Sequence, residues 1–228
     1  MITFVVSILI ALPIIAIVSF ANNVKGRKVI HMIIRCWSIF WLWIIGMPVK
    51  VKGTVPEGRY IIVANHISYM DTLIIFPAIS SYFRPLGKKE ISKVPGLGFI
   101  YKQIVILVDR SNAVSRAVSM RLMWRVLRKE GNIVIFPEGT FNETTDTLKS
   151  FYDGAFRLAL NTQTDILPLI LPDTVHRWHY SAWWKIWPGK NRAVFLKPVR
   201  VAGMEPGQVA ELKQQVFDKM EAELVKYN

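Results

Sequence analysis

The chain has little cysteine and few acidic residues. Its 228 residues include one cysteine, Cys36, which excludes a disulfide within the chain and a metal site built from cysteines. Because Cys36 lies in an apolar, tryptophan-rich stretch, we expect it to be buried as a small hydrophobic side chain. Asp and Glu number 16 against 29 Lys and Arg, a formal net charge of +13. Such an excess predicts contact with an anionic surface, either lipid head groups or nucleic acid.

Charged residues are also missing from the N-terminus, where none occurs before Lys25. About 20 apolar residues in a helix span the hydrocarbon core of a bilayer, so we predict a spanning helix at 2–21. A signal peptide would begin with basic residues, whereas here the basic residues follow at 25–28 and predict a cytoplasmic end. A second apolar stretch, 36–49, is short for a span. We predict an interfacial or re-entrant helix there, and a full second span is the alternative.

Short β-rich runs alternate with amphipathic stretches in the rest of the chain. The predicted strands are 60–64, 104–108, 133–136, 165–171 and 192–196, and the predicted helices are 71–79, 111–130, 154–160 and one from about 206. This alternation predicts an α/β domain with a central, mostly buried sheet and flanking helices. We therefore divide the chain into a membrane anchor, residues 1–50, and a second domain, residues 51–228.

Two short motifs carry candidate chemistry, and the first is N-H-I-S-Y-M-D at residues 65–71. A histidine just past a strand, with a carboxylate five residues on at a helix start, can place Asp71 against one imidazole nitrogen of His66. The other nitrogen can then act as a general base. By spacing alone, a capping histidine and an unrelated surface aspartate give the same pattern.

The second motif is F-P-E-G-T at residues 136–140, directly after a predicted strand. Gly139 permits close approach of the backbone to a ligand, and backbone N–H groups there can hold a developing oxyanion. Glu138 can orient a substrate hydroxyl or the loop itself. Taken alone, the motif is equally consistent with a simple turn at the end of a strand.

Together the motifs resemble the hallmark of the glycerolipid acyltransferase family, N-H-x4-D followed further along the chain by F-P-E-G-T. Two more blocks of that family are matched. They are the glycine-aromatic segment 96–100, which leads to a strand and Arg110, and the apolar strand with a proline at 166–169. The likeness is greatest to bacterial lysophosphatidic acid acyltransferases.

The resemblance implies transfer of a fatty acyl group from acyl-CoA or acyl carrier protein to the free hydroxyl of 1-acyl-sn-glycerol 3-phosphate. The product would be phosphatidic acid, in phospholipid biosynthesis. His66 would take the hydroxyl proton while Asp71 holds the imidazole. Arg110 would contact the phosphate, since its planar guanidinium can grip two oxygens. The residues implied in acceptor binding are Asn65, Arg110, Glu138, Gly139 and Thr140.

Further expectations concern cofactors, partners and location. No metal or bound cofactor is needed, because the acyl thioester is a co-substrate. The expected partners are membrane lipids, the lysolipid acceptor and the thioester donor, either acyl-CoA or acyl carrier protein. The domain is expected on the cytoplasmic face of the cell inner membrane.

The chain departs from the family pattern near the presumed head-group site. The family usually has an arginine where this chain has Phe141, and a basic F-K-K/R-G run where it has F-Y-D-G at 151–154. Lys149 and Arg157 lie close enough in sequence to compensate. A lysolipid with an amino-acid head group, such as a lyso-ornithine lipid, therefore remains an alternative acceptor.

Three other classes of function share some of these sequence features. Charge alone would allow nucleic-acid binding, but the basic residues come with an apolar N-terminus and no recognised nucleic-acid motif. A membrane-bound lipid hydrolase or thioesterase, with His66 and Asp71 acting on water, differs only in its independence of an acceptor. A non-catalytic lipid-binding protein is disfavoured, because His66, Asp71 and Glu138 are all present.

Overall fold

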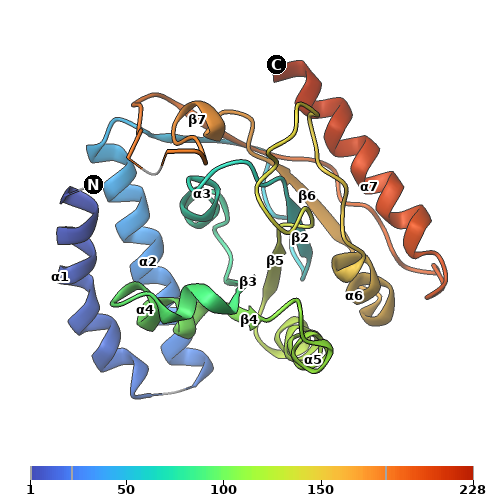
Figure 1. Cartoon of the computed structure of the whole chain (residues 1–228). Coiled ribbons are helices and arrows are strands. Elements are labelled where there is room, and N and C mark those ends of the chain that lie inside the picture. Colours follow the sequence, from blue (N-terminus) through green and yellow to red (C-terminus); the bar gives the residue numbers. More distant parts are fainter. Residues whose placement is uncertain (1, 22, 183, 228) are drawn as a thin grey trace.

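A seven-stranded sheet runs through the middle of the protein, with helices on both of its faces (Figure 1). The computed structural model describes residues 2–21, 23–182 and 184–227. The strand order is β1-β7-β6-β2-β5-β3-β4, and the neighbouring pairs are parallel except for β6 and β7. The predicted α/β class, with a central buried sheet and flanking helices, is confirmed.

The strands are β1 (Val49–Lys52), β2 (Ile61–Ala64), β3 (Phe83–Lys88), β4 (Ile106–Val108), β5 (Asn132–Ile135), β6 (Ile166–Ile170) and β7 (Asn191–Phe195). The α-helices are α1 (Ile2–Ser19), α2 (Val24–Ile44), α3 (Asp71–Ala78), α4 (Leu97–Ile104), α5 (Ala113–Lys129), α6 (Gly154–Thr162) and α7 (Val209–Leu224). Short 3-10 helices are η1 (Lys89–Lys93), η2 (Thr174–His176) and η3 (Val225–Tyr227). Each predicted strand and helix of the second domain has a counterpart here, whereas β1, β3 and α4 were not predicted.

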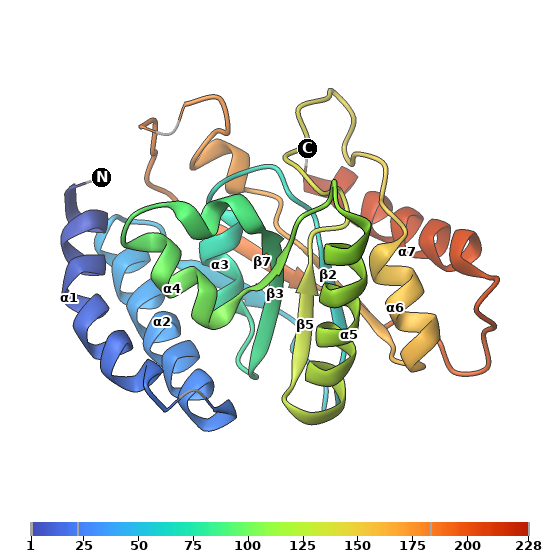
Figure 2. The same cartoon turned by 60° about the horizontal axis from the view of Figure 1, so that its bottom comes forward.

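Alternate residues of the central strands face opposite helical layers. In β2, Ile62 and Ala64 pack in the apolar cluster beneath α1 to α4, whereas Ile61 and Val63 pack against α5, α6 and α7. The side chains of a strand point alternately to its two faces, and here both faces are covered (Figure 2). Burial on both faces is the reason why these strands are almost unbroken runs of Ile and Val.

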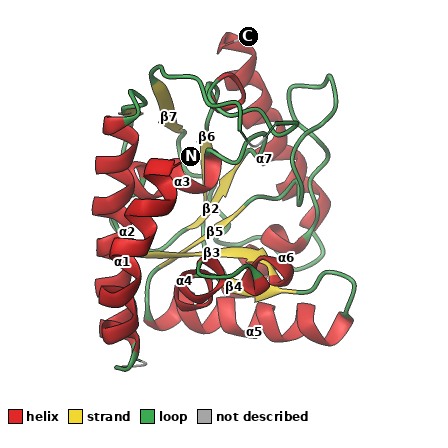
Figure 3. Ribbon diagram, turned by 60° about the vertical axis from the view of Figure 1, so that its left-hand side comes forward, coloured by secondary structure: helices red, strands yellow, loops and turns green. Residues whose placement is uncertain are grey.

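The N-terminal residues form two helices that stand side by side, α1 and α2 (Figure 3). α2 begins at Val24, where the side-chain oxygen of Asn23 accepts the Gly26 N–H at 2.8 Å. The helix predicted at 36–49 is not a separate element, because residues 36–44 are the second half of α2 and Val49 begins β1. Its place at a membrane interface stays a prediction.

The membrane span predicted at 2–21 is not found. In the part of the chain that the structure describes, no helix is both long enough and apolar enough to cross a membrane. α1 ends at Ser19 and packs along α2, where Ile15 is buried. Cys36 is exposed and not buried as predicted, since it lies on the opposite side of α2 from Ile30 and Ile34.

Candidate active site

Both sequence motifs lie at one edge of the sheet. Ile61 of β2 pairs with Ile133 of β5 and with Ile166 of β6, so these parallel strands start and end side by side. His66 follows β2 and Glu138 follows β5, which brings the two motifs together beyond the carboxyl ends of the strands. In open α/β sheets this edge is where ligands bind.

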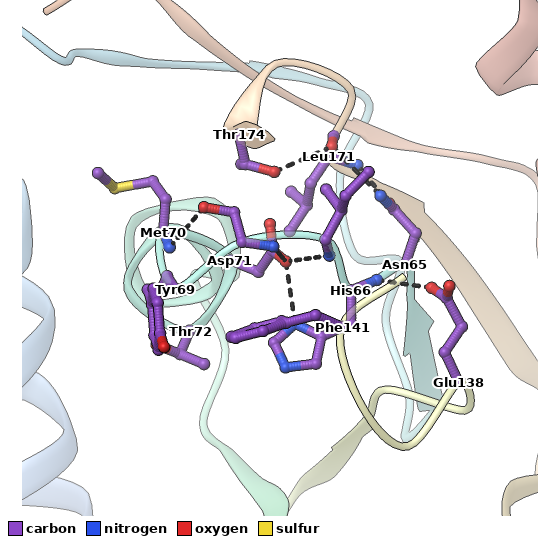
Figure 4. Close-up of polar contacts among 12 residues, drawn as sticks. Asn65, His66, Tyr69, Met70, Asp71, Thr72, Glu138, Phe141, Leu171 and Thr174 are labelled. Carbon is purple, nitrogen blue, oxygen red and sulfur yellow. Dashed lines mark hydrogen bonds and ion pairs between the residues drawn. The ribbon is translucent and has the colours of Figure 1, made fainter. Parts of the chain in front are cut away.

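The side chains of His66 and Asp71 form the polar centre of this edge (Figure 4). Nδ1 of His66 lies 2.9 Å from Oδ2 of Asp71. The same oxygen accepts the backbone N–H groups of Ile67 at 2.7 Å and Ser68 at 2.8 Å. Asp71 is fully buried and is the first residue of α3, where the helix dipole favours negative charge. The carboxylate is therefore fixed before any substrate binds.

This contact determines what the imidazole can do. If Nδ1 donates its hydrogen to the carboxylate, Nε2 carries the free lone pair and can accept a proton. Nε2 faces away from Asp71 (Figure 4). The ring stacks on Phe136 with 4.2 Å between centroids and meets Phe141 edge-on at 4.5 Å. With 14% of its side chain exposed, His66 is held in one orientation yet reachable.

Glu138 joins the two motif loops from inside the fold. One carboxylate oxygen accepts the His66 N–H at 2.7 Å, and the other accepts the Lys149 N–H at 3.0 Å. Glu138 is 1% exposed, and this burial raises the pKa of its carboxyl group to about 7. The contacts orient the loop that carries His66, and a direct contact of Glu138 with the acceptor stays a prediction.

The loop after β5 places two cations beside the site. Gly139 has a φ of +77°, which suits glycine, and its carbonyl accepts a hydrogen bond from the Arg110 guanidinium. The Nζ of Lys149 donates to the Thr140 hydroxyl at 2.9 Å. The Gly139 N–H donates to the Phe136 carbonyl at 3.1 Å and is not available for an oxyanion.

Asn65 ties this edge to the neighbouring strand. Its side-chain oxygen accepts the Leu171 N–H at 2.7 Å, and its amide donates to the Leu171 carbonyl at 3.3 Å. Asn65 is buried, so its visible role is to fix the end of β2 against the end of β6. Contact with the acceptor stays a prediction for this residue as well.

A profile of the acyltransferase family matches residues 48–171, more than half of the chain and the part that contains both motifs. The chain belongs to the acyltransferase family.

Curated relatives and a solved structure agree with this assignment. The chain is 28% identical over 205 residues to the 1-acyl-sn-glycerol-3-phosphate acyltransferase alpha of Ovis aries, covering 86% of this chain and 70% of that one. It is 35% identical over 137 residues to the 1-acyl-sn-glycerol-3-phosphate acyltransferase of Borreliella burgdorferi, covering 58% and 54%. The crystal structure of the acyltransferase PlsC from Thermotoga maritima superposes with a TM-score of 0.73 at 22% identity, covering 99% and 96%, and has the same fold.

In this acyltransferase, aromatic rings surround the imidazole, a feature that the sequence reasoning missed. Phe141 packs against Tyr69 with 4.8 Å between centroids and stacks on Tyr180 at 6.4 Å, and Tyr69 lies 5.4 Å from Trp178. These rings come from the loops after β2, β5 and β6. Their one signal in the sequence is that Tyr69, Phe136 and Phe141 lie in or beside the two motifs.

The cations predicted to compensate for the missing family arginine behave differently in this acyltransferase. Lys149 is at the site, through its contact with Thr140. Arg157 lies on α6, where it pairs with Asp153 at 3.4 Å. The described residues include no group of three or more His, Cys, Asp and Glu side chains suited to a metal ion.

Proposed function

We propose that this acyltransferase moves a fatty acyl group from acyl-CoA or acyl carrier protein to the free hydroxyl of 1-acyl-sn-glycerol 3-phosphate, forming phosphatidic acid. The observation that carries the proposal is the 2.9 Å contact between His66 Nδ1 and a fully buried Asp71, which leaves Nε2 directed away from the carboxylate. The relatives that share the matched region are named for this reaction.

The reaction is a single transfer without an acyl-enzyme. Nε2 of His66 takes the proton from the acceptor hydroxyl while its oxygen forms a bond to the thioester carbonyl carbon. Asp71 stabilises the resulting imidazolium. When the tetrahedral intermediate collapses, the carbon–sulfur bond breaks, and the imidazolium returns the proton to the thiolate that leaves.

The acceptor phosphate is held by the cations beside the loop after β5. Arg110 lies against Gly139, and Lys149 lies against Thr140, so two positive groups flank the loop that is tied to His66. Lys149 takes over the role of the arginine that Phe141 replaces. Phe141 itself packs on the imidazole and helps to exclude water from it.

Residues 1–50 seat the domain of residues 51–228 on the cytoplasmic face of the inner membrane. The α1–α2 pair presents a large apolar surface, whose strongly exposed members are Val6, Leu9, Ile10, Ile14, Ile17, Phe20, Met32, Phe40 and Trp43. The patch runs along the length of α1, as expected for a helix that lies in the plane of the membrane interface. Replacing Ile10 and Ile17 by Glu should release the protein from lipid vesicles. Val225→Glu, at the C-terminal end of the chain, is the control and should leave vesicle binding unchanged. If both variants bind vesicles equally well, α1 does not hold the domain on the membrane.

The reaction is tested by acyl transfer with a labelled acyl thioester, offered with lysophosphatidic acid or with a lyso-aminolipid. Wild type should form labelled phosphatidic acid, and His66→Ala should slow this by at least about a thousandfold. His176→Ala is the matched control, because His176 is exposed and ends the 3-10 helix η2, outside both sequence motifs.

Each contrary result points to a different error. Product only from the lyso-aminolipid would mean that the acceptor is wrong and the chemistry right. Loss of thioester without any acceptor would support a hydrolase. Full activity of His66→Ala would reject the proposed base.

A further inference from the structure

A polar cavity of about 190 Å³ lies where the α1–α2 turn meets β3 and the end of α4. Its polar lining comes from Ser19, Asn23, Arg27, Arg84, Lys102 and Gln103. We call it the α1–α2 cavity. Among the described residues, no acidic side chain lines it.

The α1–α2 cavity is separate from the candidate active site. Arg84 of β3 pairs with Ile133 of β5, which pairs with Ile61 at the start of β2. Arg84 is thus level with the amino end of β2, whereas His66 follows its carboxyl end. The length of β2, about 10 Å, and the intervening strand β5 separate the two places.

The cations of the cavity have too few counter-charges. Arg84 is 7% exposed, and its donors go to the neutral carbonyls of Ile104 at 3.2 Å and Val105 at 3.4 Å. Among the described residues, neither Arg84 nor Lys102 takes part in an ion pair. Glu130 pairs with Arg27 at 2.9 Å and also attracts Arg84 without forming an ion pair with it, so one carboxylate serves both cations.

Two further observations show that this positive charge is under-compensated. The buried Nε of Arg27 has no hydrogen-bond partner among the described residues. Burial also lowers the pKa of the Arg84 guanidinium, because the charged form loses hydration that its carbonyl partners replace only in part. A buried cation without a counter-ion is costly, and a bound anion would relieve that cost.

The size and the donors of the cavity fit a phosphate group. Water occupies about 30 Å³ per molecule, so the cavity has room for roughly six heavy atoms, and phosphate has five. Guanidinium groups match phosphate oxygens, and an ammonium group adds a point charge. A phosphate monoester carries nearly two negative charges at neutral pH, which would neutralise the two positive charges of Arg84 and Lys102.

We propose that the α1–α2 cavity binds a phosphate monoester at a second site, separate from the place of acyl transfer. The phosphate can be free in solution, or it can be the head group of a phosphatidic acid molecule in a bilayer beside α1. The proposal rests on the cavity and its charges and does not require the proposed reaction.

The test measures phosphate binding to the full-length Arg110→Gln protein, since Arg110 is the cation proposed to hold phosphate at the site of acyl transfer. Inorganic phosphate is titrated calorimetrically, and binding to phosphatidic acid vesicles is measured against phosphatidylcholine vesicles. Adding Lys102→Gln should weaken one or both of these interactions about tenfold. Lys25→Gln removes the same charge from an exposed position outside the cavity and should leave them unchanged.

Arg84→Lys is the second variant, because it keeps the charge and removes the planar fork. It should also weaken binding, and its thermal midpoint without phosphate shows whether it is folded.

Lys102-dependent binding of inorganic phosphate supports a site for free phosphate, and Lys102-dependent binding of vesicles alone supports a lipid head group. Equal effects of Lys102→Gln and Lys25→Gln, or no phosphate binding to Arg110→Gln in either assay, would overturn the proposal. None of these outcomes decides whether the wild type carries out the proposed acyl transfer, which is measured separately.

Discussion

Oδ2 of Asp71 lies 2.9 Å from Nδ1 of His66 and also accepts two backbone N–H groups of the same turn. The turn therefore holds the carboxylate, and the carboxylate holds the imidazole. Because Asp71 is also the first residue of α3, the start of this helix fixes the carboxylate and, through it, the direction of Nε2.

Replacing Asp71 by Asn should lower kcat for acyl transfer by about 10²–10⁴-fold with little change in the KM of the acceptor. The amide keeps the size of the side chain but cannot stabilise an imidazolium by charge. Steady-state kinetics on the purified protein measures both constants. Asp218→Asn is the control, since Asp218 is exposed on α7 and its carboxylate accepts a hydrogen bond from Gln214. A kcat within twofold of wild type would remove Asp71 from the mechanism.

The central part of this site could be predicted from sequence because its determinants are local. β2, β5 and β6 are apolar runs buried on both faces, and each ends where a polar or proline-containing motif begins. His66 and Asp71 are five residues apart, so one turn and one helix start decide their contact. The side chain of Glu138 was harder to place, because its partner, the His66 N–H, is 72 residues away.

The elements that were missed depend on distant contacts. β3 has the sequence FRPLGK, in which Pro85 and Gly87 argue against a strand, and pairing with β4 and β5 overrides this local preference. The first half of α2 contains Lys25, Arg27 and Lys28, which break the apolar run. Arg27 is accommodated by Glu130, 103 residues away.

Glu138 should make the protein less stable as the pH rises from 4.5 to about 7. Folding raises the pKa of this carboxyl group from 4.5 to about 7, chiefly through burial. In this interval the unfolded chain has lost the proton while the folded protein keeps it, so the free energy of unfolding falls with rising pH. Glu138→Gln should remove a fall on the order of 2–3 kcal/mol, as measured by denaturant titration at several pH values. An unchanged slope would contradict the raised pKa.

His31 should act in the opposite direction over nearly the same interval. It is buried among the rings of Phe76, Tyr82 and Phe83, and burial followed by the charge of Arg35 lowers its pKa from 6.5 to about 4. Between these values the unfolded chain binds the proton and the folded protein does not, so stability is lost as the pH falls.

In the wild type, the free energy of unfolding should fall between pH 7 and pH 4 partly because of His31. In His31→Phe this fall should be smaller by roughly 2 kcal/mol. The phenyl ring suits the aromatic cluster, and Nε2 of His31 has no partner among the described residues that the change would remove. The measurement is again denaturant titration at several pH values. Because Glu138 and His31 oppose each other, Glu138→Gln and His31→Phe should change the pH slope with opposite signs. Changes of the same sign would refute the assignment whose variant has the unexpected sign.

Gly139 should matter for the acceptor more than for stability, and Gly203 separates the two effects. Both glycines have a positive φ, +77° and +86°, so the backbone strain of alanine at either position should cost about 1 kcal/mol of the free energy of unfolding. No described residue lies within 4 Å of a Cβ at Gly203, whereas a Cβ at Gly139 would lie 2.7 Å from the Tyr152 ring and 3.0 Å from Nη1 of Arg110. Gly139→Ala must therefore shift the Tyr152 ring and push on the Arg110 guanidinium. We expect the KM for lysophosphatidic acid to rise about tenfold, while Gly203→Ala leaves it unchanged. If the two variants raise KM equally, backbone strain and not the position of Arg110 governs acceptor binding.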